Sequence, residues 1–253
     1  MNYIESVKNT KVKQWKKLLT KKERDKSGRY LIEGFHLVEE ALKEKNIVQE
    51  VIISQDTELP AGFTIEDTEI IYVAKEVMKV ICDTETPQGI AAVCEQKTQN
   101  LSEINPQRLL LVDAVQDPGN IGTMIRTADA AGMDAVILGE GCADVYNSKV
   151  IRSTQGSLFH MPVIKANLSE VINSLMEQGV PVYGTALEGA IPFEQVEKTE
   201  KFALLVGNEG QGVSKELLAK TTQNLYIPIH GRSESLNVGI AAGILMYYLR
   251  KNL

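Results

Sequence analysis

The sequence lacks a hydrophobic run long enough to cross a membrane, and it lacks the apolar core of a secretory signal peptide. Residues 238–249 contain no charged or strongly polar side chain, but these 12 residues fall short of the about 20 that a spanning helix needs. Residues 1–5, Met-Asn-Tyr-Ile-Glu, are too polar for a signal peptide. These features predict a cytoplasmic protein.

Cysteine and histidine are also scarce, with three residues of each. Their spacing matches neither a disulfide framework nor a zinc site, and no H-E-x-x-H segment is present. We therefore expect reduced, mostly buried thiols and no metal. The residues concerned are Cys82, Cys94, Cys142, His36, His160 and His230.

Several catalytic motifs are missing as well. The chain has no G-x-S-x-G segment and no Walker A loop, which disfavours an esterase and a P-loop enzyme. It has no G-x-G-x-x-G fingerprint with an acidic ribose ligand, which disfavours a dehydrogenase. What remains is an ordinary globular composition, with 43% hydrophobic and 24% charged residues in 253. That length predicts one large domain or two smaller ones.

Charge is distributed unevenly along the chain. The net charge is -6, yet residues 1–29 carry ten basic and three acidic side chains, a local charge of +7. Trp15, Leu18 and Leu19 alternate with the lysines at helical spacing, which predicts a helix with an apolar stripe and a cationic face. Such a face either binds RNA through its phosphates or is simply solvated. The candidate RNA-binding residues are Lys11, Lys13, Lys17, Arg24 and Arg29.

The hydrophobic pattern divides the chain into two α/β blocks. Strands at 30–32, 48–53, 70–73 and 90–93 alternate with helices at 35–45 and 75–80 and predict a small N-terminal domain, residues 1–95. Residues 96–107 are polar and end in an Asn-Pro turn signal, so they form the predicted linker. Residues 108–253 form the second predicted domain.

The second block has the pattern of a mostly parallel sheet with helices on both faces. Its predicted strands are 109–112, 135–138, 180–183, 203–206 and 225–227, and its predicted helices are 121–131, 168–178, a helix from 214, and 237–250. Ligands bind such sheets at the carboxyl ends of the strands. The loops at 113–120, 184–190, 207–213 and 228–237 are therefore the predicted site.

Three of these loops carry candidate functional residues. In 117–126, Pro118-Gly119 turns the chain, and Asn120 is predicted as the N-cap of a helix that carries Arg126. In 206–212, three glycines allow close backbone approach to a ligand beside Glu209, or serve only a tight turn. In 227–237, Ser235 and Asn237 precede an apolar helix, where they either bind a ligand or simply cap the helix.

Together and in this order, the three segments resemble the sequence motifs of the SpoU family of RNA ribose 2′-O-methyltransferases, within the SPOUT superfamily. The resemblance covers residues 108–253 closely and includes the segments 152–159 and 183–185. Residues 1–95, notably Asn9, Val12-Lys13 and 30–34, resemble the RNA substrate-binding domain that is often fused to this catalytic domain.

The resemblance implies more than the pattern itself. It implies a C-terminal trefoil knot, an exception to the usual rules of chain connection, a homodimer, and S-adenosylmethionine as cofactor. It implies a cofactor site that contains Thr185, Gly207, Ile227 and Leu236. It implies catalytic roles for Asn120, Arg126, Glu209, Ser235 and Asn237.

The implied reaction is attack of a ribose 2′-hydroxyl on the methyl group of a sulfonium. Arg126 is a poor free base because a guanidinium stays protonated. We expect Arg126 to hold an RNA phosphate and to stabilise the developing alkoxide, with Glu209 orienting it from the same chain or across the dimer. The identity of the general base stays open.

The sequence leaves the substrate open. Ribosomal RNA is the first expectation because of the N-terminal domain, and transfer RNA is the alternative. An inactive RNA-binding protein of the same fold is the second alternative, which the presence of the candidate catalytic residues disfavours. The sequence does not identify the RNA or the modified nucleotide.

Overall fold

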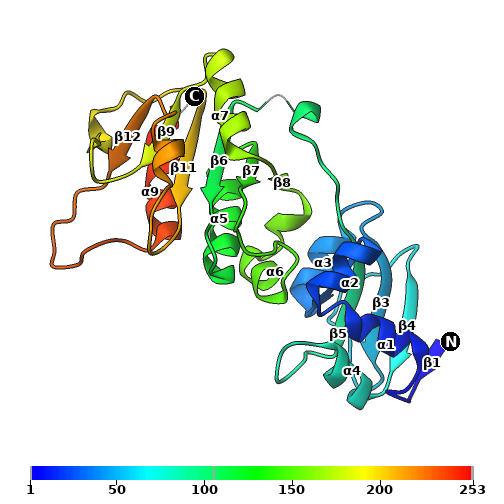
Figure 1. The fold of residues 1–253 in the computed structure, drawn as a ribbon. Coiled ribbons are helices and arrows are strands. Elements are labelled where there is room, and N and C mark those ends of the chain that lie inside the picture. The colour runs from blue at the N-terminus through cyan, green and yellow to red at the C-terminus, as the bar shows by residue number, and fades with distance from the viewer. Residues whose placement is uncertain (1, 105, 252–253) are drawn as a thin grey trace. The chain divides into compact units, whose positions relative to one another are not determined.

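The computed structural model describes residues 2–104 and 106–251, which fold into two compact units. The first unit comprises the described residues up to Thr98 together with Tyr146–His160, and the second comprises Gln99–Val145 and the described residues from Met161 onward. Figure 1 shows the course of the chain through both units. No helix in the described ranges is long and apolar enough to cross a membrane.

A five-stranded mixed sheet forms the centre of the first unit. The strand order is β1-β4-β3-β5-β2; β4 pairs parallel with β1 and β3, and β5 pairs antiparallel with β3 and β2. The strands predicted at 30–32, 48–53, 70–73 and 90–93 are confirmed, and a further strand near the N-terminus was not predicted. Their bounds are β1 (Asn2–Ile4), β2 (Arg29–Glu33), β3 (Val48–Ser54), β4 (Glu69–Val73) and β5 (Ile90–Glu95).

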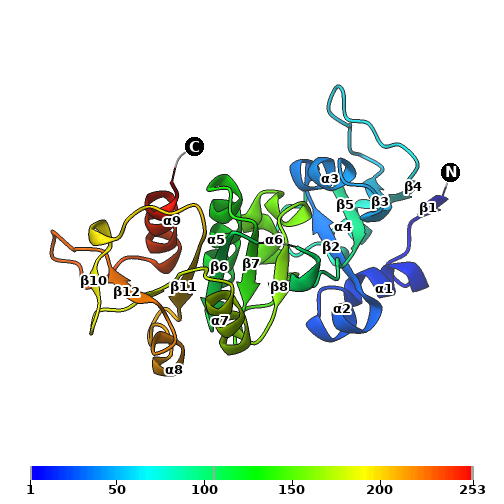
Figure 2. The ribbon, with the colours of Figure 1, turned by 90° about the horizontal axis from the view of Figure 1, so that it is seen from above.

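Helices cover both faces of this sheet (Figure 2). α1 (Thr10–Lys17) and α4 (Lys75–Ile81) share one hydrophobic cluster with β3 and β4, and α3 (Phe35–Leu42) covers the other face. The apolar stripe predicted near the N-terminus is confirmed, since Trp15 and Leu18 are buried. The Trp15 indole Nε1 donates a hydrogen bond of 2.8 Å to Glu50.

The basic N-terminal stretch forms two helices instead of the single helix that the spacing predicted. α1 ends at Lys17 and α2 (Lys21–Ser27) follows a short turn. Arg24 is only 4% exposed, and its guanidinium donates a hydrogen bond of 2.8 Å to the carbonyl of Leu18 in that turn. Arg24 thus stabilises the connection between the helices.

α6 (Ser148–Thr154) and the 3-10 turn η2 (Ser157–Phe159) belong to the first unit, although the neighbouring sequence belongs to the second. Arg152 of α6 forms ion pairs with Glu33 at 3.0 Å and Asp83 at 3.3 Å. Ser148 donates a hydrogen bond of 2.6 Å to Asp83. This hydrogen bond and those from Arg152 lower the pKa of Asp83.

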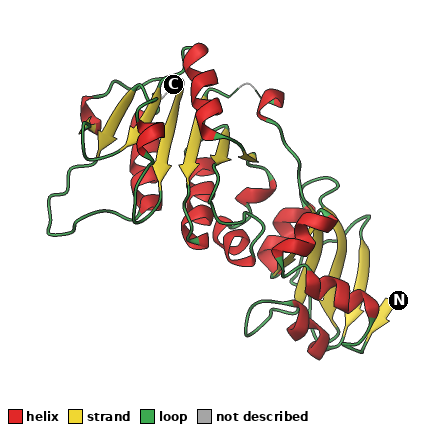
Figure 3. Ribbon diagram, viewed as in Figure 1, coloured by secondary structure: helices red, strands yellow, loops and turns green. Residues whose placement is uncertain are grey.

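The second unit is built on a seven-stranded sheet in which every pair is parallel (Figure 3). The strand order is β10-β12-β9-β11-β6-β7-β8. The buried apolar runs predicted as parallel strands are confirmed at its centre. The bounds are β6 (Arg108–Asp113), β7 (Ala135–Leu138), β8 (Val163–Lys165), β9 (Val182–Thr185), β10 (Ile191–Pro192), β11 (Phe202–Gly207) and β12 (Gln223–Tyr226).

Helices lie on both faces of this sheet, as predicted (Figure 2). α5 (Pro118–Ala130) and α9 (Val238–Leu249) cover one face, and α7 (Leu168–Glu177) and α8 (Lys215–Leu218) cover the other. α9 approaches α5 closely because Gly239 and Gly243 face Thr123 and Thr127. The remaining 3-10 turns are η1 (Leu101–Glu103) and η3 (Phe193–Gln195).

Candidate functional site

Four neighbouring strands of the second unit, β12, β9, β11 and β6, end at the same edge of its sheet because they are parallel. Thr185 is the last residue of β9, Gly207 is the last of β11, and Ile227 directly follows β12. The sheet thus brings these three predicted cofactor-binding residues to adjacent strand ends. The Thr185 hydroxyl donates a hydrogen bond of 3.1 Å to the carbonyl of Leu205.

The loop after β11 folds back on itself. Backbone hydrogen bonds join Asn208 and Gly212 in both directions, at 3.0 and 2.9 Å. A Cβ atom on Gly207 would lie 2.2 Å from the backbone nitrogen of Val213, so only glycine fits there. The Asn208 side chain donates a hydrogen bond of 2.9 Å to the carbonyl of Ala114, which ties this loop to the loop after β6.

Glu209 makes the second connection between these two loops. Its carboxylate accepts hydrogen bonds from the backbone N–H groups of Asp117, at 3.1 Å, and Gln116, at 3.3 Å. It also accepts one from the Asn120 amide at 3.0 Å. Partial burial opposes its ionisation, but these hydrogen bonds together lower the pKa of Glu209 below its ordinary value.

Asn120 joins the third loop to the first two. Its side-chain oxygen accepts a hydrogen bond of 2.8 Å from the Asn237 amide, while its own amide nitrogen binds Glu209. Asn237 also caps α9, since its oxygen accepts from the backbone N–H of Gly239 at 2.9 Å. The two roles considered for Asn237, capping and site formation, are therefore both present.

The predicted N-cap of α5 is wrong. Asp117 is the N-cap and accepts a hydrogen bond from the backbone N–H of Asn120, which lies in the first turn of the helix. Asp before Pro-Gly is the stronger signal, because proline at the first helical position already has helical φ and needs no acceptor. Asn208 was also missed, although Asn-x-Gly is a common turn sequence.

Arg126 and Ser235 lie outside this hydrogen-bonded network. Arg126 is exposed on α5, six residues after Asn120, and it forms no hydrogen bond or ion pair with any residue the structure describes. Ser235 is exposed, and its carbonyl accepts a hydrogen bond of 3.0 Å from the Ser233 hydroxyl. The expected pairing of Glu209 with Arg126 is not formed within the chain, because Glu209 binds Asn120 and the backbone instead.

The same sheet edge has the donor groups and apolar surface that S-adenosylmethionine requires. Leu187, in the loop after β9, is 80% exposed, and Ile229 and Leu236, between β12 and α9, are each 38% exposed. In residues 229–236 no backbone N–H donates to an acceptor within the described chain. Unpaired backbone donors beside exposed apolar side chains suit a cofactor with an adenine ring, a ribose and a carboxylate.

The five predicted RNA-binding residues differ in their availability. Lys13, Lys17 and Arg29 are exposed. Lys11 forms ion pairs with Glu50 at 2.9 Å and Glu69 at 3.4 Å, and Arg24 is buried. Cys82 and Cys94 are buried thiols, as expected, and Cys142 is partly buried. Within the described ranges, no three His, Cys, Asp or Glu residues are grouped as a metal site requires.

Comparison with known families divides the chain in two. Residues 107–247 match the SpoU rRNA Methylase family. Residues 9–92 match the MRM3-like substrate binding domain. The first match covers more than half of the chain and contains all the loops described above.

Similar proteins span almost the whole chain. The 23S rRNA (guanosine(2553)-2′-O)-methyltransferase RlmP of Bacillus subtilis (strain 168) is 52% identical over 250 residues, which cover 99% of this chain and 100% of that protein. The AdoMet-bound rRNA methyltransferase from Sinorhizobium meliloti has a TM-score of 0.88 and 32% identity, with 98% and 97% of the two chains covered.

A further solved structure holds the same cofactor. The SpoU methyltransferase AviRb from Streptomyces viridochromogenes, in complex with AdoMet, has a TM-score of 0.85 and 27% identity, with 96% and 97% of the two chains covered. These comparisons confirm the predicted fold class, cofactor and reaction. The chain belongs to the SpoU rRNA methylase family and is an S-adenosylmethionine-dependent RNA 2′-O-ribose methyltransferase.

Proposed function

We propose that this protein methylates the 2′-hydroxyl of one guanosine in 23S rRNA. That guanosine is the equivalent of guanosine 2553, for which its Bacillus relative is named. The observation that carries this proposal is 52% identity over the full length of a relative named for that nucleotide. This similarity favours ribosomal RNA over transfer RNA. The aligned region includes the N-terminal unit, whose match to a substrate binding domain supports a role in binding the RNA.

The cofactor-binding roles follow from position at the sheet edge. S-adenosylmethionine, when bound, supplies an electrophilic methyl group. Thr185, Gly207 and Ile227 would hold it at three adjacent strand ends, and Leu236 would cover its apolar part. The Glu209–Asn120–Asn237 hydrogen bonds, with Asn120 in the middle, fix the three loops relative to one another before any ligand binds, which is the preorganisation that catalysis needs.

We assign to Arg126 the role of binding the RNA beside the reacting ribose. Its exposed guanidinium has no partner in the described chain, so it is free to bind a phosphate of the substrate. A cation placed there stabilises the charge that develops on the 2′-oxygen as its proton leaves. Ser235, also exposed, lies in the same loop as the cofactor residues and is proposed to contact the substrate.

RNA affinity is proposed to come from the N-terminal residues. Residues 1–95 would bind RNA, residues 96–107 would link the two domains, and residues 108–253 would catalyse methyl transfer. Lys13, Lys17 and Arg29 are exposed and offer three cations to phosphates. Lys11 and Arg24 contribute less, because Lys11 is held by Glu50 and Glu69 and Arg24 is buried.

The protein is further proposed to act as a homodimer in the cytoplasm. Ile240, Ile244 and Tyr247 of α9 are 54%, 38% and 59% exposed and follow helical spacing along one face. Contiguous exposed apolar side chains mark an association surface. The Bacillus relative is named for 23S rRNA, which in bacteria lies in the cytoplasm, and this supports the proposed location.

A substrate that lacks the 2′-hydroxyl of the target guanosine tests the proposed reaction. The full-length protein is incubated with methyl-labelled S-adenosylmethionine and a 23S rRNA fragment that contains guanosine 2553, or the same fragment with 2′-deoxyguanosine there. We expect label in the first RNA only. Label in both would refute the assigned position, and label in neither, with S-adenosylmethionine still bound, would support an inactive RNA-binding protein.

A further inference from the structure

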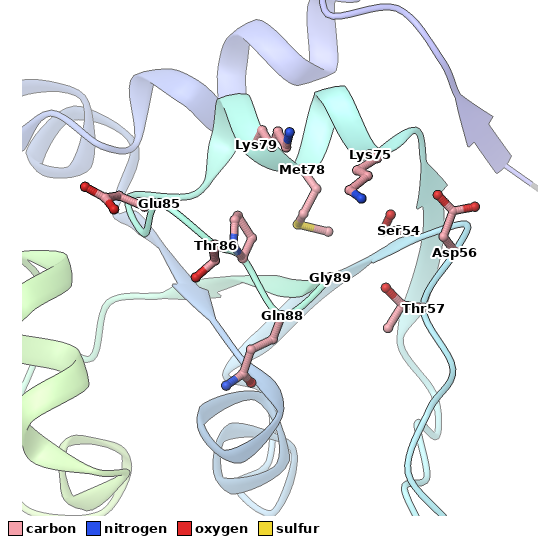
Figure 4. A pocket seen from close by; sticks show the side chains of 11 residues that line it. Ser54, Asp56, Thr57, Lys75, Met78, Lys79, Glu85, Thr86, Gln88 and Gly89 are labelled. Carbon is pink, nitrogen blue, oxygen red and sulfur yellow. The ribbon is translucent and has the colours of Figure 1, made fainter.

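A cavity of about 450 Å³ lies in the first unit, whereas the methyl-transfer residues belong to the second. Three segments form its walls: the end of β3 with the residues that follow it, helix α4, and the loop that leads into β5 (Figure 4). Its volume falls in the range of small-molecule sites. Nothing in the methyl-transfer mechanism uses it.

Ser54 at the end of β3 carries an unused hydroxyl into this cavity. The residue is 4% exposed, and its hydroxyl forms no hydrogen bond with the part of the chain that the structure describes. Its backbone is fully engaged, because the N–H donates to Gly89 at 2.8 Å and the carbonyl accepts from Thr57 at 2.9 Å. The enclosed side-chain atoms that lack a partner do not include this oxygen, so it reaches the cavity and is available to hydrogen-bond a polar ligand.

The charged groups around the cavity are of both signs. Lys75 and Lys79 of α4 line it, and neither forms an ion pair with a described residue. Asp56 and Glu85 line it as well and are exposed. A site for a bare anion would not include two carboxylates, whereas a ligand with a phosphate and neutral N–H donors offers partners to the ammonium groups and to the carboxylates.

The cavity also has an apolar wall. Met78 lies between the two lysines on α4 and extends toward the centre of the cavity in Figure 4. It is 2% exposed, and Pro87 lines the opposite loop. A thioether and a proline ring offer a flat ligand polarizable contact. Phosphate, amino groups and a flat ring together describe a nucleotide.

We propose that this cavity binds one unstacked nucleotide of the RNA substrate. Lys75 and Lys79 would bind its phosphate, Met78 would pack against the base, and Ser54 would donate or accept a hydrogen bond at the base or ribose. Proteins read single-stranded RNA by holding such splayed bases. The inference deepens the proposed function, since it rests on this unit binding the RNA that the enzyme methylates.

Binding of the 23S rRNA fragment to full-length protein, without S-adenosylmethionine, tests the site by fluorescence anisotropy at several salt concentrations. Lys75→Ala and Lys79→Ala should each weaken binding about 10-fold and reduce the slope of log K against log salt by about 0.7. Ser54→Ala should weaken binding about 3-fold without changing the slope, because no charge is lost. Lys45→Ala is the matched control. Lys45 is also exposed, but it precedes the start of β3, whereas Ser54 is at the end of that strand.

The outcomes separate the alternatives. Ser54→Ala binding like the wild type, or Lys75→Ala and Lys79→Ala no weaker than Lys45→Ala, would overturn the site. Micromolar binding of guanosine monophosphate that the three cavity variants abolish, with RNA binding unchanged, would assign it to a free nucleotide and equally overturn it. Methyl transfer by the wild type is measured in parallel, so the pocket and the proposed function can fail separately. Unchanged S-adenosylmethionine affinity and urea midpoints show that the variants are folded.

Discussion

At the residue scale, the amide of Asn120 is the group that holds the site together. Its nitrogen donates to Glu209 and its oxygen accepts from Asn237. One side chain therefore connects all three loops. An amide is suited to this role because it has a donor and an acceptor on one planar group. Aspartate at this position would place a second carboxylate against Glu209 and break the connection.

Arg126→Ala is expected to reduce methyl transfer at least about 100-fold in single turnover, the usual cost of removing one charge-stabilising donor. The calorimetric affinity for S-adenosylmethionine should not change, since Arg126 forms no hydrogen bond with the described residues that hold the loops. Arg126→Lys should restore only part of the rate, because lysine cannot bind a phosphate through two parallel hydrogen bonds. Loss of cofactor affinity with normal single-turnover chemistry would contradict this assignment.

Glu209 makes the stability of the site depend on pH. Its pKa in the folded protein is lowered from the ordinary 4.5, so its stabilising effect is fully present above 4.5 and is lost as the pH falls through the lower, folded value. Glu209→Gln should therefore lower the free energy of urea unfolding at pH 7, and the difference from the wild type should shrink at more acidic pH. A difference that grows below pH 4.5 would show the opposite shift.

The residues of the site could be predicted from the sequence, but their partners could not. Asn120, Glu209 and Asn237 come together as expected, yet Glu209 binds Asn120 rather than Arg126. Hydrogen-bond partners depend on how the loops close, and residue type alone does not fix that. The sequence also gave no signal for the unused hydroxyl of Ser54, since serine after a strand is common in turns.

At the scale of elements, segments with a clear hydrophobic pattern were predictable, including short ones such as β7 and α4, and several other short ones were not. The buried strands β6, β7 and β11 and the helices α5, α7 and α9 lie close to their predicted bounds. The missed elements include β1 and β8 with three residues each, β10 with two and α6 with seven. Such segments contain too few residues to display a period.

Helix α1 and the first residue of β2 should set the salt dependence of RNA binding. Removing the cations of Lys13, Lys17 and Arg29 together by alanine substitution should reduce the slope of log K against log salt by about 2 to 3, at about 0.7 to 0.9 per phosphate contact. Lys11→Ala is the control on the same helix, and its effect should be small because Glu50 and Glu69 already hold that ammonium. An unchanged slope in the triple variant would mean that the cationic face is only solvated.

Helix α9 should carry the dimer contact. Ile240→Asp places a charge on its exposed apolar face, and light scattering after gel filtration should show a monomer where the wild type is a dimer. Met176→Asp on α7, at a residue of similar exposure (43%), should leave the dimer intact. A wild type that is monomeric at micromolar concentration would contradict the homodimer.

At the scale of the whole molecule, the two-block pattern and the parallel sheet could be read from the sequence, and the strand order could not. Placing β11 between β9 and β6 depends on crossovers, which leave no local pattern. The assignment of residues 146–160 to the first unit also depends on tertiary contacts, such as Arg152 with Glu33. The trefoil knot implied by the family resemblance stays a prediction.

Mapping of 2′-O-methyl groups in cellular 23S rRNA tests the central claim most directly. Deleting the gene should remove the methyl group from one guanosine, at the position equivalent to 2553, and expression of the wild-type protein should restore it. The Arg126→Ala protein, produced at the same level, should not restore it. A methyl group that persists in the deletion, or that the Arg126→Ala protein restores fully, would contradict the claim.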